Sequence, residues 1–88
     1  MDDGRPLREF PDNYSIKAVG RDADDFACYA KSIVEAVIEK KDSITHKTRE
    51  SKNGSYLSVT VYFIALDQAE LDAVFTTVNA DERVLWVL

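Results

Sequence analysis

The feature that most constrains the fold is an alternating segment at residues 56–65, YLSVTVYFIA. Its apolar set is Leu57, Val59, Val61, Phe63 and Ala65. A period of two is the side-chain period of a β-strand, so we expect one buried face and one face turned away from the core. Asn53-Gly54 comes just before the segment and is typical of a hairpin turn, which predicts an antiparallel partner strand in the polar residues 43–52.

Two other segments have the 3.6-residue period of an amphipathic helix. The first runs from Asp22, which is expected to cap it, to about Lys41. The second begins at Asp67, which has capping-box spacing to Glu70. The predicted buried positions are Phe26, Ala30, Ile33, Val34, Val37 and Ile38 in the first helix, and Leu71, Val74, Phe75 and Val78 in the second.

Residues 14–20 predict a short first strand and residues 83–88, RVLWVL, predict an apolar last strand. The element order is therefore βαββαβ. Right-handed crossovers place both helices on one face of an antiparallel sheet with strand order 4-1-3-2. This is the α+β, ferredoxin-like plait. We expect a single domain over residues 14–88, preceded by an N-terminal tail over residues 1–13.

Composition narrows the class of protein. One cysteine, Cys28, and one histidine, His46, exclude an internal disulfide and a four-ligand zinc site. No stretch reads as a signal peptide or membrane span, so a cytoplasmic location is expected. The net charge is −5, which disfavours nucleic acid as a partner, although a basic strip runs from Lys40 to Lys52.

Two segments carry a resemblance to a known family. FPDNYSIKAVG (10–20) and SKNGSYLSVTV (51–61), followed by a capped helix and the ending VLWVL, resemble the YbeD-like family of small bacterial proteins of unknown function. The resemblance covers residues 10–88. It implies a ferredoxin-like fold similar to the ACT-type regulatory domains that bind amino acids and control enzymes, and it implies no catalytic residue.

The turn after the first strand is the candidate ligand site. Gly20 lets backbone approach closely, Arg21 adds a positive charge, and Asp22 marks a helix start whose free N–H groups attract a carboxylate. An ACT-like domain would admit an amino acid here. The alternative interpretation is structural, since glycine commonly ends a strand and aspartate commonly caps a helix.

The candidate partner interface consists of Tyr62, Leu85 and Val87. The last strand is apolar on both faces, and if Val84, Trp86 and Leu88 point into the core, then Leu85 and Val87 remain on the open face. Such an edge invites a protein partner or a second copy of the chain. The alternative is that the tail, with Leu7 and Phe10, folds back over this edge.

An RNA-binding plait is a further alternative, because Lys52, Gly54, Tyr56 and Tyr62 imitate an RNA-reading strand. The first strand offers no outward aromatic residue, which weighs against it. Cys28 and His46 have no activating neighbour in sequence, and the acids near Asp22 lack ligand spacing, so we predict no catalytic, metal or cofactor site. The preferred interpretation is a non-enzymatic regulatory or interaction module that binds a protein partner or a small effector.

Overall fold

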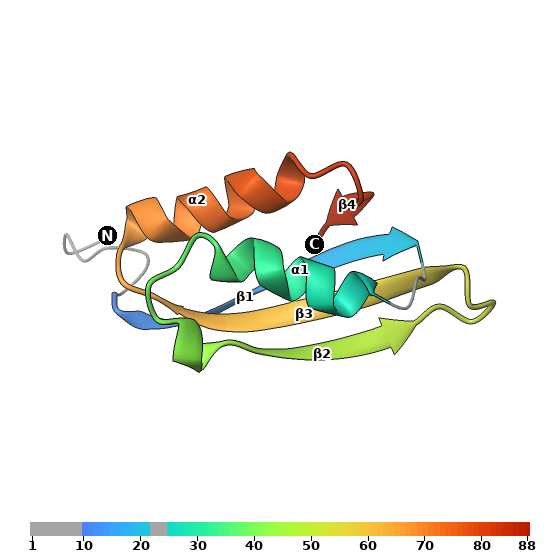
Figure 1. The fold of residues 1–88 in the computed structure, drawn as a ribbon, viewed down its shortest axis with the longest axis horizontal. Helices are drawn as coiled ribbons and strands as arrows, with labels where there is room; N and C mark the ends of the chain where they lie inside the picture. Colours follow the sequence, from blue (N-terminus) through green and yellow to red (C-terminus); the bar gives the residue numbers. More distant parts are fainter. Residues whose placement is uncertain (1–9, 22–24) are drawn as a thin grey trace, which may run out of the picture.

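Four antiparallel strands form one sheet in the order β2-β3-β1-β4, and the chain crosses it twice through a helix (Figure 1). The computed structural model describes residues 10–21 and 25–88. The elements are β1 (Asp12–Arg21), α1 (Phe26–Glu35), the 3-10 turn η1 (Lys41–Ser43), β2 (Thr45–Glu50), β3 (Tyr56–Ala65), α2 (Gln68–Asn79) and β4 (Trp86–Val87). The predicted ferredoxin-like topology and strand order are confirmed.

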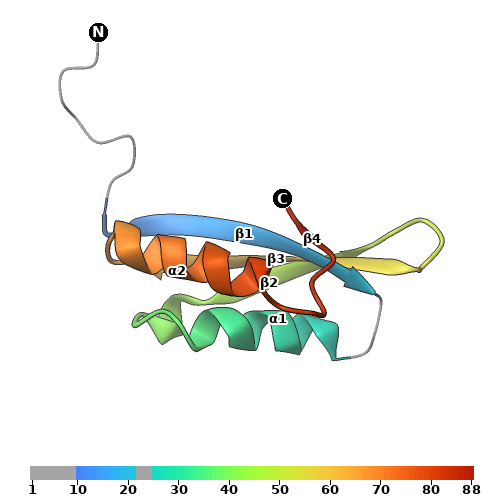
Figure 2. The ribbon, with the colours of Figure 1, turned by 90° about the horizontal axis from the view of Figure 1, so that it is seen from above.

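Both helices lie on the same side of the sheet (Figure 2). The side chains predicted to face inward from β3 are at most 9% exposed, and Phe63 is fully buried. The helices contribute Phe26, Ala30, Val34, Leu71, Val74 and Val78 to the same core. Burying one such side chain contributes about 1.5–3 kcal/mol, so this shared apolar face is what holds the two layers together.

β1 and β3 pair along their whole length, from Asp12 opposite Ala65 to Arg21 opposite Tyr56. Ile16 and Ala18 lie opposite Val61 and Val59, and all four face the helices. The residues between them therefore face away from the helices. This register fixes which side chains share the uncovered side of the sheet.

The first helix is shorter than the predicted range from Asp22 to about Lys41. Its N-cap is Asp25, whose side chain makes no capping hydrogen bond, and it ends at Glu35. Asp22 lies outside the described residues. After Glu35 the chain must turn towards β2 while keeping Ile38 buried, and the Lys41 ammonium donates to the Ile38 carbonyl at 2.7 Å in that turn.

The second helix has the predicted cap. Oδ1 of Asp67 accepts a hydrogen bond from the backbone N–H of Glu70 at 2.8 Å. The Glu70 carboxylate reaches back to the N–H of Leu66 and also accepts from the N–H of Glu39, both at 2.9 Å. Glu70 therefore ties the start of α2 to the connection that follows α1. No helix in the described ranges is long and apolar enough to cross a membrane.

The hairpin between β2 and β3 turns through residues 51–55. Gly54 has a φ of 73°, as a glycine in the left-handed region can. The N–H of Gly54 donates to the Ser51 carbonyl at 3.0 Å, and the N–H of Ser51 donates to the Tyr56 carbonyl at 2.9 Å. The predicted turn is confirmed, although its loop is longer than a two-residue turn.

The orientation predicted for the last strand is wrong. Val87 lies opposite Ala18 and packs against the core, whereas Trp86 lies opposite Val19 on the uncovered side. The phase is set by backbone bonds to β1, including Leu88 N–H to the Lys17 carbonyl at 2.9 Å. Trp86 is 46% and Leu88 70% exposed. Val84 is buried as predicted.

Candidate functional site

The uncovered side of the sheet has an apolar hollow beside β4. Its volume is about 250 Å³. Its polar walls are Arg49, Glu50, Ser51 and Ser58, and its apolar walls are Val19, Tyr56, Trp86 and Leu88. We call the recess between Val19, Tyr56, Trp86 and Leu88 the edge hollow. The Tyr56 and Trp86 rings lie 5.6 Å apart between centroids. Val19 faces away from the helices yet is only 4% exposed, because its neighbours on this face cover it.

Positive side chains accompany the edge hollow. The register places Lys17 and Arg21 of β1 and Lys47 and Arg49 of β2 on the uncovered side. The outward positions of the four strands are residues 13, 15, 17, 19 and 21, residues 45, 47 and 49, residues 56, 58, 60, 62 and 64, and residues 86 and 88. None of these positions holds an acidic residue.

A second hollow of about 290 Å³, which we call the corner hollow, lies at the end of the sheet beside the C-terminal end of β1 and the start of α1. Its walls include Arg21, Phe26, Arg83 and Leu85. The Arg83 guanidinium donates to both carboxylate oxygens of Asp25, at 2.8 and 3.1 Å, and also lies over the rings of Tyr29 and Phe26. Arg83, one wall of the corner hollow, is therefore already engaged in an ion pair with Asp25.

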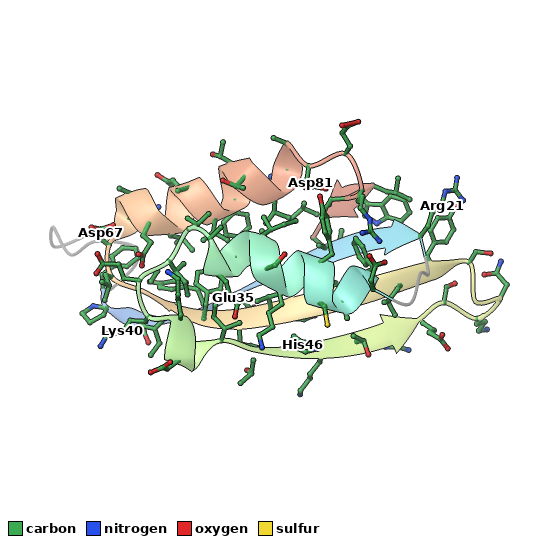
Figure 3. The ribbon with its side chains drawn as sticks, in the orientation of Figure 1. Arg21, Glu35, Lys40, His46, Asp67 and Asp81 are labelled. Carbon is green, nitrogen blue, oxygen red and sulfur yellow. The ribbon has the colours of Figure 1, made fainter. Side chains whose placement is uncertain are left out.

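Contacts among the ionisable groups at the corner hollow shift their pKa values. The hydrogen bond from Arg83 lowers the pKa of Asp25, and the same contact raises the pKa of Arg83. The Tyr29 hydroxyl donates to the carboxylate of Asp81, which raises the pKa of Tyr29. These contacts join the start of α1 to the segment between α2 and β4, where Asp81 lies (Figure 3).

Of the predicted ligand residues, Gly20 and Arg21 are described, and both lie near Phe26 and Arg83. A Cβ atom on Gly20 would lie 2.5 Å from Cζ of Phe26 and 2.8 Å from the Arg83 carbonyl oxygen, so Gly20 is covered by packing. Arg21 is exposed at the C-terminal end of β1 and lines the corner hollow (Figure 3). Asp22 lies outside the described residues. Ligand binding at this turn stays a prediction.

The predicted interface residues do not form one surface. Tyr62 is half-buried on the uncovered side, Leu85 is 43% exposed at the corner hollow, and Val87 faces the helices. Sequence reasoning missed Trp86 and Leu88 as outward residues, since the phase of a uniformly apolar strand has no signal in its own sequence. The tail residue Phe10 stacks on Tyr14 with centroids 5.4 Å apart, and Leu7 lies outside the described residues.

Cys28 is exposed on α1, as its position opposite the core stripe predicts, and His46 is exposed on β2. Neither side chain makes a hydrogen bond to another described residue. Within residues 10–21 and 25–88, no three His, Cys, Asp or Glu side chains gather as a metal site would require. The open sheet face with its edge hollow is the candidate site, because the exposed apolar side chains of Trp86 and Leu88 lie on it.

The family model described as "Protein of unknown function (DUF493)" matches residues 5–88. The chain belongs to this family. Among its curated relatives are UPF0250 proteins from Azotobacter vinelandii, 34% identical over 84 residues, and from Nitrosomonas europaea, 30% identical over 82 residues. These alignments cover 94% and 93% of this chain, and 91% and 94% of the relatives. The predicted YbeD-like resemblance is confirmed.

A solved structure shares the fold of this chain. The solution structure of protein HP0495 from H. pylori superposes with a TM-score of 0.74 at 17% identity, covering 99% of this chain and 91% of that chain. The match confirms the ferredoxin-like fold of this DUF493 member. No catalytic family is indicated by these comparisons.

Proposed function

We propose that the protein is a non-enzymatic interaction module whose protein partner docks on the edge hollow and the adjoining edge of β4. The observation that carries the proposal is the position of the exposed apolar side chains. Within the described residues, the large exposed apolar side chains are Leu85, Trp86 and Leu88, and all three belong to one short segment. Trp86 and Leu88 of this segment both line the edge hollow, and exposed apolar side chains that lie together are typical of an interaction surface.

The energetics favour docking at this segment. Tryptophan is enriched among the residues that contribute most to protein interfaces, because it buries a large rigid surface. Trp86 and Leu88 are 46% and 70% exposed, so each has surface left to bury. Covering such a side chain contributes up to about 1.5–3 kcal/mol. The edge hollow offers a recess next to both side chains into which a partner side chain can insert.

The backbone at this edge supports the same proposal. β4 pairs with β1 at Ala18 and Val19, and Leu88 extends the contact to Lys17. β4 is an edge strand of the sheet, with β1 on one side and no strand among the described residues on the other. Unpaired strand edges bind extended segments of other chains through main-chain hydrogen bonds.

The direct test is site-specific photo-crosslinking in the native host. A photoreactive phenylalanine analogue replaces Leu88 in one variant and Thr76, an exposed residue of α2, in a matched control. The proposal predicts a discrete protein adduct from position 88, none from position 76, and loss of the adduct when Trp86→Lys is added. The mass of the adduct distinguishes crosslinking to a second copy of the chain from crosslinking to a different protein.

Equal adducts from both positions, or none from position 88, would overturn the proposal. The fold of each variant is checked by circular dichroism, and little change is expected because the substituted side chains are exposed. A Trp86→Lys variant that keeps its fold and its adduct would also contradict the proposed role of the edge hollow.

An ACT-like, amino-acid-binding regulatory role is the second candidate. The corner hollow favours it, because a cation, Arg21, and an apolar ring, Phe26, both line it, a combination suited to a carboxylate with an apolar side chain. A thermal-shift screen against the amino acids tests this candidate. A rise in melting temperature that Arg21→Ala abolishes would support it, and no rise at millimolar concentration would remove it.

A further inference from the structure

We infer that the partner of the edge hollow presents an extended, acidic peptide segment with an apolar residue, an inference that rests on the proposed interaction function. The exposed apolar side chains alone do not specify the chemistry of the partner. That chemistry follows from the order of side chains across the sheet and from the separation of charge between the two faces of the molecule.

Two rows of outward side chains cross the sheet from β4 to β2. One row is Leu88, Lys17, Thr60 and Lys47, and the next is Trp86, Val19, Ser58 and Arg49. Each row begins with a large apolar side chain and ends with a cation. Adjacent strands lie about 4.8 Å apart, so the cations of β2 are roughly 10 Å from β1 across the sheet. A segment anchored in the edge hollow can reach them.

The cations on this face are available to a partner. Within the described residues, the ion pair is the one between Arg83 and Asp25, at the other side of the sheet. Lys17 and Arg49 have no carboxylate of the described residues within ion-pair distance, and Lys47 lies over the Tyr62 ring at 5.8 Å from its centroid. One carboxylate, that of Glu50, lines the edge hollow beside Arg49, but the outward-facing positions of β1 and β2 hold cations and no acid, so these positions complement an incoming acid.

The α2 side of the helical layer has the opposite charge. Residues 66–82, which include α2, contain five acidic residues and no Lys or Arg. Asp67, the first of these acids, and Asp81, the fourth, lie at opposite ends of α2 (Figure 3). An acidic segment is repelled by the α2 side and attracted by the uncovered sheet, so the charge separation orients the partner before contact.

The aromatic side chains favour a peptide over single-stranded nucleic acid. Stacking platforms for bases need aromatic rings with a free face. One face of Tyr62 lies against Lys47, and Tyr56 packs against Trp86. Between them β3 offers only Ser58 and Thr60. The apolar recess instead suits the side chain of an aliphatic or aromatic residue.

The spacing of the cations also suits a peptide. Lys47 and Arg49 are two residues apart on β2, so their side chains share one face about 6.7 Å apart. Acidic residues at alternate positions of an extended peptide have the same spacing. Such a segment can place its acids on this pair while an apolar residue occupies the edge hollow.

The test uses Trp86, the one tryptophan of the chain, as the reporter. The full chain is titrated with a short peptide of alternating Asp and Leu, with a Lys and Leu peptide of the same length, and with single-stranded oligouridine. We expect the Asp and Leu peptide alone to shift the Trp86 emission to shorter wavelength. The affinity is expected to fall as salt is raised, because the charges lie at the surface.

A double charge reversal, Lys47→Glu with Arg49→Glu, is expected to weaken this binding by about five- to twentyfold, since each exposed ion pair contributes modestly. The matched control, Lys31→Glu with Lys40→Glu, changes the net charge equally on the helical side and should leave the affinity within about twofold. The control separates a local effect from a change in overall charge.

Equal weakening by both double variants, or no binding of the Asp and Leu peptide, would overturn the inference of an acidic partner. If the adduct at position 88 still forms in that case, the interaction function stands and only the partner's chemistry is wrong. Oligouridine binding that depends on Lys47 and Arg49, without peptide binding, would overturn the inference in favour of nucleic acid.

Discussion

The guanidinium of Arg83 donates two hydrogen bonds to the carboxylate of Asp25, 58 positions away in sequence. The same guanidinium lies 4.4 Å from the centroid of the Tyr29 ring, and the backbone N–H of Arg83 donates to Asp81 at 2.8 Å. Arg83 directly precedes the segment that leads into β4. The pair therefore helps to hold β4, and with it the edge hollow, at the edge of the sheet.

Asp25→Asn tests this ion pair through its pH dependence. Because the folded-state pKa of Asp25 lies below its ordinary value of 3.8, the contribution of the pair is complete above that value and is lost as the pH falls through the lower, folded pKa. The free energy of unfolding of the wild type should therefore fall more steeply in acid than that of Asp25→Asn. Urea unfolding from about pH 6 to about pH 2 measures both. Parallel curves would contradict the expectation.

Tyr29→Phe tests a contact whose contribution to stability is lost at high pH rather than at low pH. The folded-state pKa of Tyr29 is raised above 10.0 because its hydroxyl donates to Asp81. That contribution is complete below the unfolded pKa and is lost as the pH rises through the folded pKa. The stability difference between wild type and Tyr29→Phe should therefore shrink from about pH 7 to about pH 11, as followed by thermal unfolding. A constant difference would exclude this hydrogen bond as a source of stability.

Gly20→Ala should destabilise the fold by about 1–3 kcal/mol through overpacking. A Cβ atom there would lie 2.5 Å and 2.7 Å from two carbons of the Phe26 ring. Urea unfolding measures the loss, and adding Phe26→Leu should make the second substitution less costly than it is in the wild type. Gly54→Ala is the comparison, since nothing lies within 4 Å and its φ of 73° costs about 1–2 kcal/mol. An additive double variant would show that the ring does not fill this space.

Glu70→Ala should destabilise the protein by about 1–2 kcal/mol, because the N–H groups of Leu66 and Glu39 lose their acceptor together. The matched control is Asp72→Ala, two residues further along α2, whose carboxylate contacts only the exposed Gln68 side chain among the described residues. The control should change stability by no more than about 0.5 kcal/mol in the same denaturation experiment. Equal losses would indicate a general charge effect on α2.

Much of the fold could be predicted because the periodic patterns of apolar residues that define its strands and helices lie within short stretches of sequence. The inward set of β3, the capping residue Asp67 and the turn at Gly54 each follow from neighbouring residues, and the topology follows from their order. The end of α1 was not predictable, since apolar residues continue to Ile38 after the helix has turned. Tertiary packing decides that boundary rather than helical periodicity.

The candidate site was less predictable because it is assembled across the sheet. The sequence alone shows the basic strip between Lys40 and Lys52. It does not show that this strip shares a face with Lys17 and the edge hollow, because that depends on the register of three strand pairs. RVLWVL is apolar at most positions, so alternation cannot assign its faces. The hydrogen bonds of Leu88 with Lys17 decide that Trp86, rather than Val87, faces outward.

The most direct measurement is an amide NMR titration of the labelled full chain with the partner recovered by crosslinking at position 88. The account predicts that the largest shifts fall on Lys17, Val19, Ser58, Trp86 and Leu88, and that α2 stays unchanged. Shifts concentrated on the helices, with the outward residues of the sheet unmoved, would contradict the claim that the uncovered face beside β4 is the binding surface.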